Sequence, residues 1–329
     1  MNRVFRAGAV LGAVTSLVLA GCTKEGAPRG QDHSTSVSFE NPDELDIVER
    51  LPTSPPDVRL RYDENPLTFG DLRLPEGDTE GDVPLVIMLH GGAWESDYSL
   101  DYMSPLAEAL TDAGVATWNI EFRRLSNKGG SYPGIFLVAA HGIDYARQLA
   151  KKYPIDLDRV VLMGHSSGGH LATWAAGRQN IPASSEFYTN DPLPVSGVVD
   201  LAGVLDLESA YKHGRKDVLK LLAAKDGSDI ADKAPIASSI NLLPMGVPQT
   251  LIIGSKDNTW RLGSQRRYRD AGVEGGDAID LVELDGANHF DTVDPCSPAW
   301  DPIVSAVLEY TGSSATKRDR SLNEGLCRG

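Results

Sequence analysis

One segment constrains the fold of this chain more than any other: an apolar run that leads into a turn of glycine and serine. Residues 160–163 (V-V-L-M) favour a buried strand, and residues 171–176 (L-A-T-W-A-A) favour a helix. Between them, residues 164–168 read G-H-S-S-G and match G-x-S-x-G, in which a strand turns sharply into a helix and strains the backbone at the central serine. The pattern predicts that Ser166 is a nucleophile; the alternative is a turn serine with a structural part only.

The rest of the chain alternates between short β-rich runs and helical patterns. Several of the runs are continuously apolar, which suits strands buried on both faces. This order predicts an α/β fold, with a mostly parallel sheet, helices on both faces and the carboxyl ends of the strands at one edge. The predicted strands lie at residues 85–89, 115–122, 160–163, 195–201, 250–253 and 281–284, and the predicted helices at residues 102–113, 135–152, 171–178 and 303–310.

Residues 205–245 interrupt this alternation. They contain a charged helical stretch at residues 211–225, followed by a segment with proline and serine, and they lie between two predicted strands. We expect them to form a small cap over the edge of the sheet.

Glycines also follow the predicted strand at residues 85–89, where residues 90–94 read H-G-G-A-W. Such a loop can turn N–H groups toward the sheet edge, and two donors there stabilise the oxyanion of acyl transfer. We expect the donors to be the amide of Gly92 or Ala93 and the amide of Ser167, the residue after the nucleophile. His90 is expected to brace the loop rather than to act as the base.

A serine nucleophile needs a base, and the base needs an orienting carboxylate. In hydrolases with this motif the partners follow the serine in the order acid, then histidine. Asp257 follows the predicted strand at residues 250–253, and His289 lies in a small-residue loop after the predicted strand at residues 281–284. We therefore expect Asp257 as the acid and His289 as the base, with Asp200 as the alternative acid.

Composition and motifs exclude several classes of function. The formal net charge of −15 disfavours binding to nucleic acid or to an acidic membrane surface. We find no H-E-x-x-H or C-x-x-C spacing and no G-x-G-x-x-G after a strand, so neither a metal nor another cofactor is expected. Trp94 follows the glycines of the expected oxyanion loop, residues 90–94, and Trp260 follows the expected acid, Asp257. Both tryptophans are candidates for pocket walls, with core packing as the alternative.

The N-terminus has the pattern of an export signal. Arg3 and Arg6 precede an apolar run at residues 7–20 that is too short for a permanent membrane span, and Leu-Ala-Gly-Cys at residues 19–22 is similar to the lipobox of bacterial lipoproteins. We expect a signal peptide at residues 1–21 and a diacylglyceryl anchor on Cys22; the alternative is an ordinary cleaved signal. The protein would then be exported and held to a membrane by lipid alone, on its periplasmic or extracellular face.

The expected organisation is a flexible tether at residues 22–46, one hydrolase domain at residues 47–312 and a polar tail at residues 313–329. In an oxidising compartment, Cys296 and Cys327 are candidates for a disulfide that ties the tail to the domain. Two free thiols are the alternative.

The two glycine-rich motifs together resemble a known family. From about residue 57 to residue 310 the chain is similar to the α/β-hydrolase superfamily, in the branch of small bacterial esterases marked by H-G-G-x-W and G-H-S-x-G-G-H. That branch is similar to acetyl-xylan and feruloyl-type carbohydrate esterases and to kynurenine formamidases. Two positions depart from its pattern: Val138 stands where the family usually has aspartate, and residues 258–261 (N-T-W-R) stand where it often has a Val-Pro turn.

The motifs and the resemblance imply a serine hydrolase that cleaves carboxylic esters through an acyl-enzyme. The resemblance implies a small-molecule ester as substrate, of a short-acyl or carbohydrate type. An aryl-formamidase is the alternative, since it has the same motifs, and a hydrolase-like binding module without activity is the second alternative.

Overall fold

The computed structural model describes residues 51–76, 81–95, 97–313 and residue 327. The expected signal peptide, the lipidation site Cys22 and the tether at residues 22–46 lie outside the described residues, as does most of the polar tail. Among the helices that are described, none has both the length and the apolar character needed to span a membrane.

Within the described residues, eight strands form one sheet in the order β1-β2-β4-β3-β5-β6-β7-β8. β1 and β2 run antiparallel at one edge, and the pairs from β4 onward are parallel. β3, β4, β6 and β7 are buried along their whole length, as continuous apolar runs predict. The strands are β1 (Val58–Arg61), β2 (Phe69–Arg73), β3 (Val83–Leu89), β4 (Ala116–Ile120), β5 (Ile155–His165), β6 (Gly197–Leu201), β7 (Gln249–Gly254) and β8 (Ile279–Leu284).

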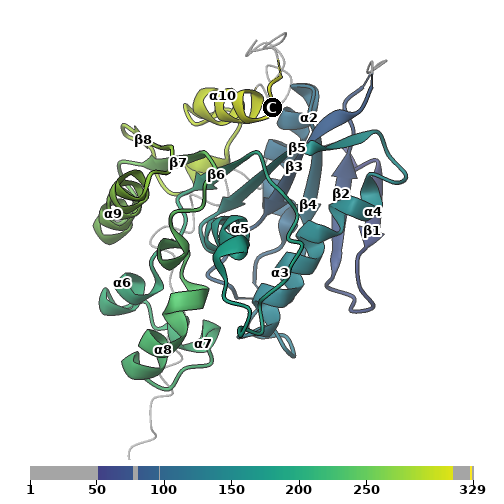
Figure 1. The fold of residues 1–329 in the computed structure, drawn as a ribbon. Coiled ribbons are helices and arrows are strands. Elements are labelled where there is room, and N and C mark those ends of the chain that lie inside the picture. The colour runs from purple at the N-terminus through teal and green to yellow at the C-terminus, as the bar shows by residue number, and fades with distance from the viewer. Residues whose placement is uncertain (1–50, 77–80, 96, 314–326, 328–329) are drawn as a thin grey trace, which may run out of the picture. The chain divides into compact units, whose positions relative to one another are not determined.

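Helices cover both faces of the sheet, and the architecture is that of an α/β-hydrolase. Figure 1 shows α2 and α10 on one side of the sheet and α3 and α5 on the other. The mostly parallel sheet with helices on both faces confirms the predicted fold class. The main helices are α2 (Ser104–Asp112), α3 (Gly134–Asp144), α4 (Ala146–Leu149), α5 (Ser167–Ala176), α9 (Thr259–Gly275) and α10 (Trp300–Tyr310), with 3₁₀ turns η1 (Leu100–Met103), η2 (Gly177–Asn180) and η4 (Phe290–Val293).

The expected cap consists of several short helices. They are α6 (Leu207–Lys212), α7 (Asp217–Leu221), α8 (Gly227–Ala237) and the 3₁₀ turn η3 (Ser239–Leu242). The prediction of one helical stretch at residues 211–225 is wrong. Helix α6 ends at Lys212, and Gly214 then adopts a positive φ of 95°, which a continuous helix does not allow. The segment packs through contacts of α6 with α8 and with α9 (Figure 1).

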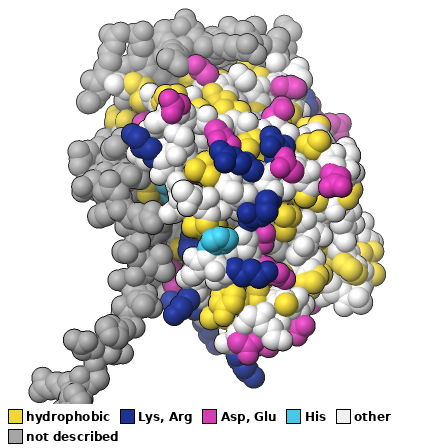
Figure 2. Space-filling model, turned by 90° about the vertical axis from the view of Figure 1, so that its left-hand side faces the viewer, with side chains coloured by type: hydrophobic (Ala, Val, Ile, Leu, Met, Phe, Trp, Pro, Cys, Tyr) yellow, Lys and Arg dark blue, Asp and Glu magenta, His cyan; other side chains and the backbone are white. Residues whose placement is uncertain are grey.

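The face formed on the side of α6, α8 and α9 mixes both signs of charge. Figure 2 shows Lys and Arg side chains interspersed with Asp and Glu on this face. Several of the basic side chains lie within ion-pair distance of a carboxylate, at 2.5 Å between Arg266 and Glu283 and 3.3 Å between Lys212 and Glu208. This face is therefore not a uniformly basic surface.

Candidate active site

Ser166 lies between β5 and α5 in a backbone conformation that residues other than glycine rarely adopt, with φ 54° and ψ −115°. Two glycines make this turn possible. A Cβ on Gly164 would lie 2.2 Å from the carbonyl oxygen of Gly168, and a Cβ on Gly168 would lie 2.1 Å from the carbonyl oxygen of Leu89. Strand and helix thus touch through their backbones, which is the physical reason for small residues around the serine.

The loop after β3 carries three consecutive positive φ angles, at Gly92 (110°), Ala93 (53°) and Trp94 (60°). The Trp94 N–H donates a hydrogen bond to the Ser167 Oγ at 3.1 Å, which holds this loop against the start of α5. In the described part of the chain, the amides of Gly92, Ala93 and Ser167 donate to no acceptor. These expected oxyanion donors are therefore not used within the fold. The loop that carries Gly92 and Ala93 lies next to Ser166, because a Cβ on the preceding Gly91 would lie 3.0 Å from the Ser166 Cβ.

His90 is buried beneath the same loop. Its Nδ1 lies 2.8 Å from the carbonyl oxygen of Gly91, and its Nε2 lies 3.0 Å from the Glu121 Oε1. Arg124 contacts the same carboxylate oxygen at 3.3 Å. Burial alone would raise the pKa of Glu121, but the charges of His90 and Arg124 bring it below its ordinary value. These contacts match the expected bracing role of His90.

Asp257 and His289 meet at the carboxyl ends of β7 and β8, with 2.7 Å between the Asp257 Oδ2 and the His289 Nδ1. The His289 ring lies 4.5 Å from the ring of His165, centroid to centroid, so it stands beside the residue that precedes the nucleophile. Its Nε2 is buried and has no hydrogen-bond partner among the described residues. The structure therefore brings acid and base together beside the turn, while a hydrogen bond between the Ser166 Oγ and the His289 Nε2 is not formed.

Burial and neighbouring charges have opposing effects on the pKa values of Asp257 and His289. Burial alone would raise the pKa of Asp257, but the charges of His289 and Arg261 hold it well below its usual range. For His289, burial lowers the pKa, Asp257 raises it and Arg261 lowers it again, and the net direction is downward. Asp257 is therefore charged and His289 is neutral at neutral pH, and a neutral imidazole is the state that a general base needs.

Tyr102 connects the oxyanion loop with the turn that holds the serine. Its Oη accepts a hydrogen bond from the Gly91 N–H and lies 2.8 Å from the His165 Nδ1, while the His165 Nε2 lies 3.2 Å from the carbonyl oxygen of His289. A carbonyl can only accept, so the Nε2 of His165 carries the proton and its Nδ1 accepts from the phenol. Burial lowers the pKa of His165 well below its usual value and keeps it neutral. One chain of hydrogen bonds thus ties the three site loops together.

No sequence signal marked Tyr102 in advance. It lies at the start of a predicted helix and carries no motif. The contacts of Arg261 with Asp257 and of Gln265 with Asp200 were not predicted either. Both residues lie on α9, a helix without clear apolar periodicity that the sequence did not predict. Their contacts depend on how α9 packs against β7 and β8.

Asp200, the alternative acid, does not take the place of Asp257. It is fully buried at the end of β6, where it accepts hydrogen bonds from the Gly203 N–H at 3.0 Å and the Gln265 Nε2 at 2.7 Å. In the described residues no hydrogen bond links it to His289. Burial raises the pKa of Asp200 to about 7, since these neutral donors only partly replace water.

The two candidate pocket tryptophans have different environments. Trp94 is 1% exposed and meets the ring of His170 edge-on at 5.6 Å, so it packs in the interior. Trp260 is half-buried, and the ring of His213 from the cap stacks on it at 6.4 Å. The Arg215 guanidinium also lies 5.7 Å above the Trp260 ring. Trp260 thus connects the segment after Asp257 with the expected cap at residues 205–245.

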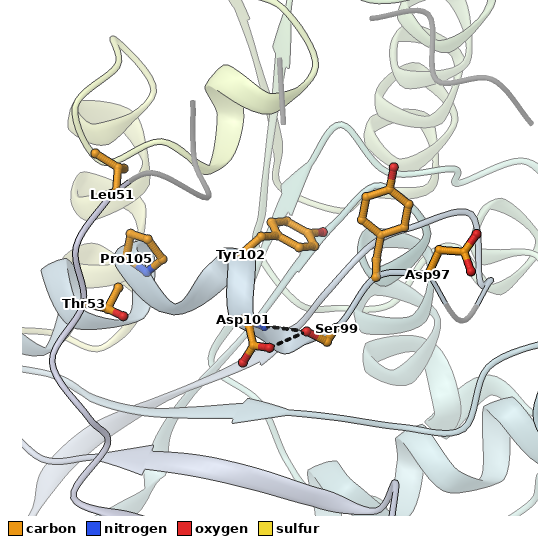
Figure 3. A pocket seen from close by; sticks show the side chains of 8 residues that line it. Leu51, Thr53, Asp97, Ser99, Asp101, Tyr102 and Pro105 are labelled. Carbon is orange, nitrogen blue, oxygen red and sulfur yellow. Dashed lines mark hydrogen bonds between the residues drawn. The ribbon is translucent and has the colours of Figure 1, made fainter. Parts of the chain in front are cut away.

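A pocket of about 320 Å³ adjoins the oxyanion loop through two tyrosines, Tyr98 and Tyr102. Figure 3 shows Tyr102 in its wall and a hydrogen-bonded pair formed by Ser99 and Asp101. Tyr98 packs against Gly92, where a Cβ would lie 2.6 Å from the Tyr98 Cβ. The pocket is lined by neither the nucleophile nor the base.

Two further features concern the chemistry of the chain outside this site. The structure joins Cys296 and Cys327 by a disulfide, the pairing that the sequence favoured. Within the described ranges, no group of three or more His, Cys, Asp or Glu side chains is arranged to hold a metal ion.

Comparison with curated proteins finds similar esterases. A probable isoprenylcysteine alpha-carbonyl methylesterase of Oryza sativa is 26% identical over 75% of this chain and 60% of its own length. A probable mitochondrial carboxylesterase of Arabidopsis thaliana is 25% identical over 69% of this chain and 65% of its own length. The esterase LipQ of Mycobacterium tuberculosis is 26% identical over 63% of this chain and 50% of its own length. The chain thus spans less than two thirds of the length of these relatives.

Solved structures with the same fold are also esterases. A truncated carbohydrate esterase from gut microbiota superposes with a TM-score of 0.68 at 20% identity, over 79% of this chain and 98% of the other. A thermophilic esterase of Thermogutta terrifontis superposes with a TM-score of 0.65 at 20% identity, over 83% of this chain and all of the other. At these identities the likeness establishes the α/β-hydrolase fold.

A family model matches the central part of the chain. The BD-FAE model covers residues 71–264, which is more than half of the chain. The matched stretch includes the oxyanion loop, the serine turn and Asp257, and it ends before His289. From the extent of this match, the chain belongs to the BD-FAE family.

Proposed function

We propose that this protein is a serine hydrolase that cleaves carboxylic esters through an acyl-enzyme intermediate. Ser166 attacks the acyl carbonyl, and the Nε2 of His289 accepts the serine proton. Asp257 holds the proton on the Nδ1 of His289 and stabilises the imidazolium that forms. The imidazolium gives the serine proton to the alcohol oxygen as the C–O bond of the ester breaks, the alcohol leaves, and the acyl group stays on Ser166. Water then attacks the acyl carbon and gives a proton to His289, which returns it to the Ser166 oxygen as the carboxylic acid leaves.

The observation that carries this proposal is the Asp257–His289 pair, 2.7 Å apart, beside a serine held at φ 54°. The amides of Gly92, Ala93 and Ser167 complete the arrangement, because two such donors at an oxyanion lower the barrier of acyl transfer. The N-terminus of α5 adds its dipole at the same place. The esterase names of the curated relatives support an ester rather than another acyl substrate.

Replacing the nucleophile tests this mechanism. The Ser166→Ala protein is expected to lose about 10⁴–10⁶-fold in kcat for p-nitrophenyl acetate, because no other hydroxyl takes the serine's place. Ser228→Ala, at an exposed position of α8, is the matched control and should keep wild-type activity. Hydrolysis retained by Ser166→Ala contradicts the proposal.

The substrate is proposed to be an ester with a short acyl group or a carbohydrate alcohol. One fold neighbour is described as a carbohydrate esterase, which supports this class by analogy. A panel of p-nitrophenyl esters of increasing chain length, acetylated sugars and N-formylkynurenine decides the question. Faster hydrolysis of N-formylkynurenine than of every ester would replace the proposal with an aryl-formamidase.

We also propose that the protein is exported and anchored by lipid on Cys22. The support is the N-terminal sequence: two arginines, an apolar run of signal-peptide length and Leu-Ala-Gly-Cys at residues 19–22. Two acyl chains suffice for stable membrane attachment.

A further inference from the structure

Arg261 lies against the pair formed by Asp257 and His289. Its side chain is 4% exposed in the first turn of α9. The Nη1 donates a hydrogen bond to the Asp257 Oδ1 and lies 3.3 Å from the Nδ1 of His289. The carboxylate therefore has two partners, one on each oxygen: the guanidinium on Oδ1 and the imidazole on Oδ2.

The protonation state of His289 decides what the guanidinium does there. A charged carboxylate can only accept hydrogen bonds, so the contact of 2.7 Å between the Asp257 Oδ2 and the His289 Nδ1 places the proton on Nδ1. Arg261 is also a donor only, so it cannot bond to an Nδ1 that carries a proton. The contact of 3.3 Å is consequently one of charge, and it is repulsive once the imidazole becomes an imidazolium.

The other charged and titratable groups around His289 act in both directions: Asp257 favours the imidazolium more strongly than Arg261 opposes it, and Arg261 offsets part of that effect. His165, at the end of β5, is neutral because burial holds its pKa well below the usual value. Arg215, from the connection between α6 and α7, acts on His289 in the same direction as Arg261. Asp257 is the acidic partner, and it is shared with Arg261.

We propose that Arg261 is a positioning residue of the triad, which fixes the Asp257 carboxylate and opposes protonation of His289, so that the enzyme keeps its activity at acid pH. This inference rests on the proposed function. A base must be unprotonated to accept the serine proton, and a nearby positive charge makes protonation harder. The acid limb of the kcat/KM profile, which reports the free enzyme, therefore lies at lower pH with Arg261 than without it.

Three variants separate charge from structure. Arg261→Gln removes the charge and is expected to move the acid limb of kcat/KM upward by about one pH unit or more. Arg261→Lys keeps a positive charge and should shift the limb much less. Arg266→Gln is the matched control on the same helix: Arg266 is paired with Glu283 and exposed, and its loss should leave the profile unchanged.

One measurement keeps Arg261 in place and therefore does not depend on whether an Arg261 variant folds. An NMR titration of His289 in the Ser166→Ala protein should give a pKa below 6.5, and the same titration with Arg261→Gln added should give a higher value. Coincident acid limbs for wild type and Arg261→Gln, or a His289 pKa at or above 6.5 with Arg261 in place, overturn the inference. Activity retained by Ser166→Ala contradicts the proposed function instead, and the NMR comparison still tests Arg261.

Discussion

At the scale of single residues, two buried aspartates lie near the carboxyl ends of neighbouring strands, and their surroundings shift their pKa values in opposite directions. Asp257 lies between an imidazole and a guanidinium, which hold its pKa well below the usual range. Asp200 accepts its hydrogen bonds from two neutral donors, and burial raises its pKa to about 7. The same side chain is thus an ion at one strand end and a partly protonated acid at the next.

Asparagine at each position should separate the two roles. Asp257→Asn is expected to lower kcat by about 10⁴-fold, because the amide no longer holds the proton on the Nδ1 of His289. Asp200→Asn should lower kcat far less. Steady-state assays of both variants at pH 8 make the comparison, and equal losses would contradict the assignment of Asp257.

Asp200 should also make stability depend on pH. Its pKa in the folded protein is above the unfolded value near 3.8, so the folded state binds the extra proton. The corresponding stability is present below about pH 4 and is lost as pH rises toward 7, by at most about 4 kcal/mol. Urea unfolding of wild type and Asp200→Asn at pH 4 and pH 8 should show a smaller fall for the variant; an equal fall would refute the prediction.

Tyr102 is expected to affect turnover more than substrate binding. Tyr102→Phe leaves the Gly91 N–H and the His165 Nδ1 without partners, which costs about 1–3 kcal/mol of stability and loosens the oxyanion loop. We expect kcat to fall about tenfold with little change in KM. Tyr310→Phe is the matched control, because its hydroxyl bonds to the Thr250 Oγ1 at 2.6 Å, away from the site, and its loss should affect stability alone.

At the scale of elements, the packing of strand against helix decides which glycines are required. Gly168 lies where α5 meets β3 through backbone atoms only, and a Cβ there would lie 2.1 Å from the Leu89 carbonyl oxygen. Gly263 lies in α9, where the nearest atom to an added Cβ is the flexible Arg267 Nη1 at 3.5 Å. Both are glycines within helices, and they differ only in their neighbours.

Alanine at these two glycines should therefore have effects of opposite sign. Gly263→Ala is expected to raise the free energy of unfolding by about 0.5–1 kcal/mol, since alanine is the better helix former. Gly168→Ala should lower it by about 3 kcal/mol or more and reduce activity, because the backbone must move. Urea unfolding of both proteins gives the sign, and stabilisation by Gly168→Ala would contradict the close approach.

The elements also show where sequence patterns are weak. The six parallel strands were predicted, and for β3, β4, β6 and β7 the reason is that burial on both faces produces continuous apolar runs. The two antiparallel strands β1 and β2 were missed: β1 (V-R-L-R) is short, and β2 carries Asp71, whose carboxylate is neutralised by Arg59 at 2.6 Å from the neighbouring strand. Helix α9 was missed because its apolar residues follow no helical repeat.

At the scale of the whole molecule, the lipid anchor proposed on Cys22 has a direct test. Expressed in a bacterial host, the full chain should partition into the detergent phase of Triton X-114 and incorporate labelled palmitate. Cys22→Ser should do neither, while its rate of p-nitrophenyl acetate hydrolysis should stay unchanged, because the candidate site lies elsewhere in the chain. Palmitate labelling that persists in Cys22→Ser would refute the anchor at this residue.

The sequence by itself determined the fold class and the candidate nucleophile, base and first-choice acid, because each of these residues lies in the turn or loop after a predicted strand and local sequence pattern shows where strands end. Only the tertiary structure showed that Asp257 rather than Asp200 meets His289, that Tyr102 joins three loops and that Arg261 shares the carboxylate. These contacts link residues from separate strands and helices, and local sequence pattern does not record the packing that brings them together.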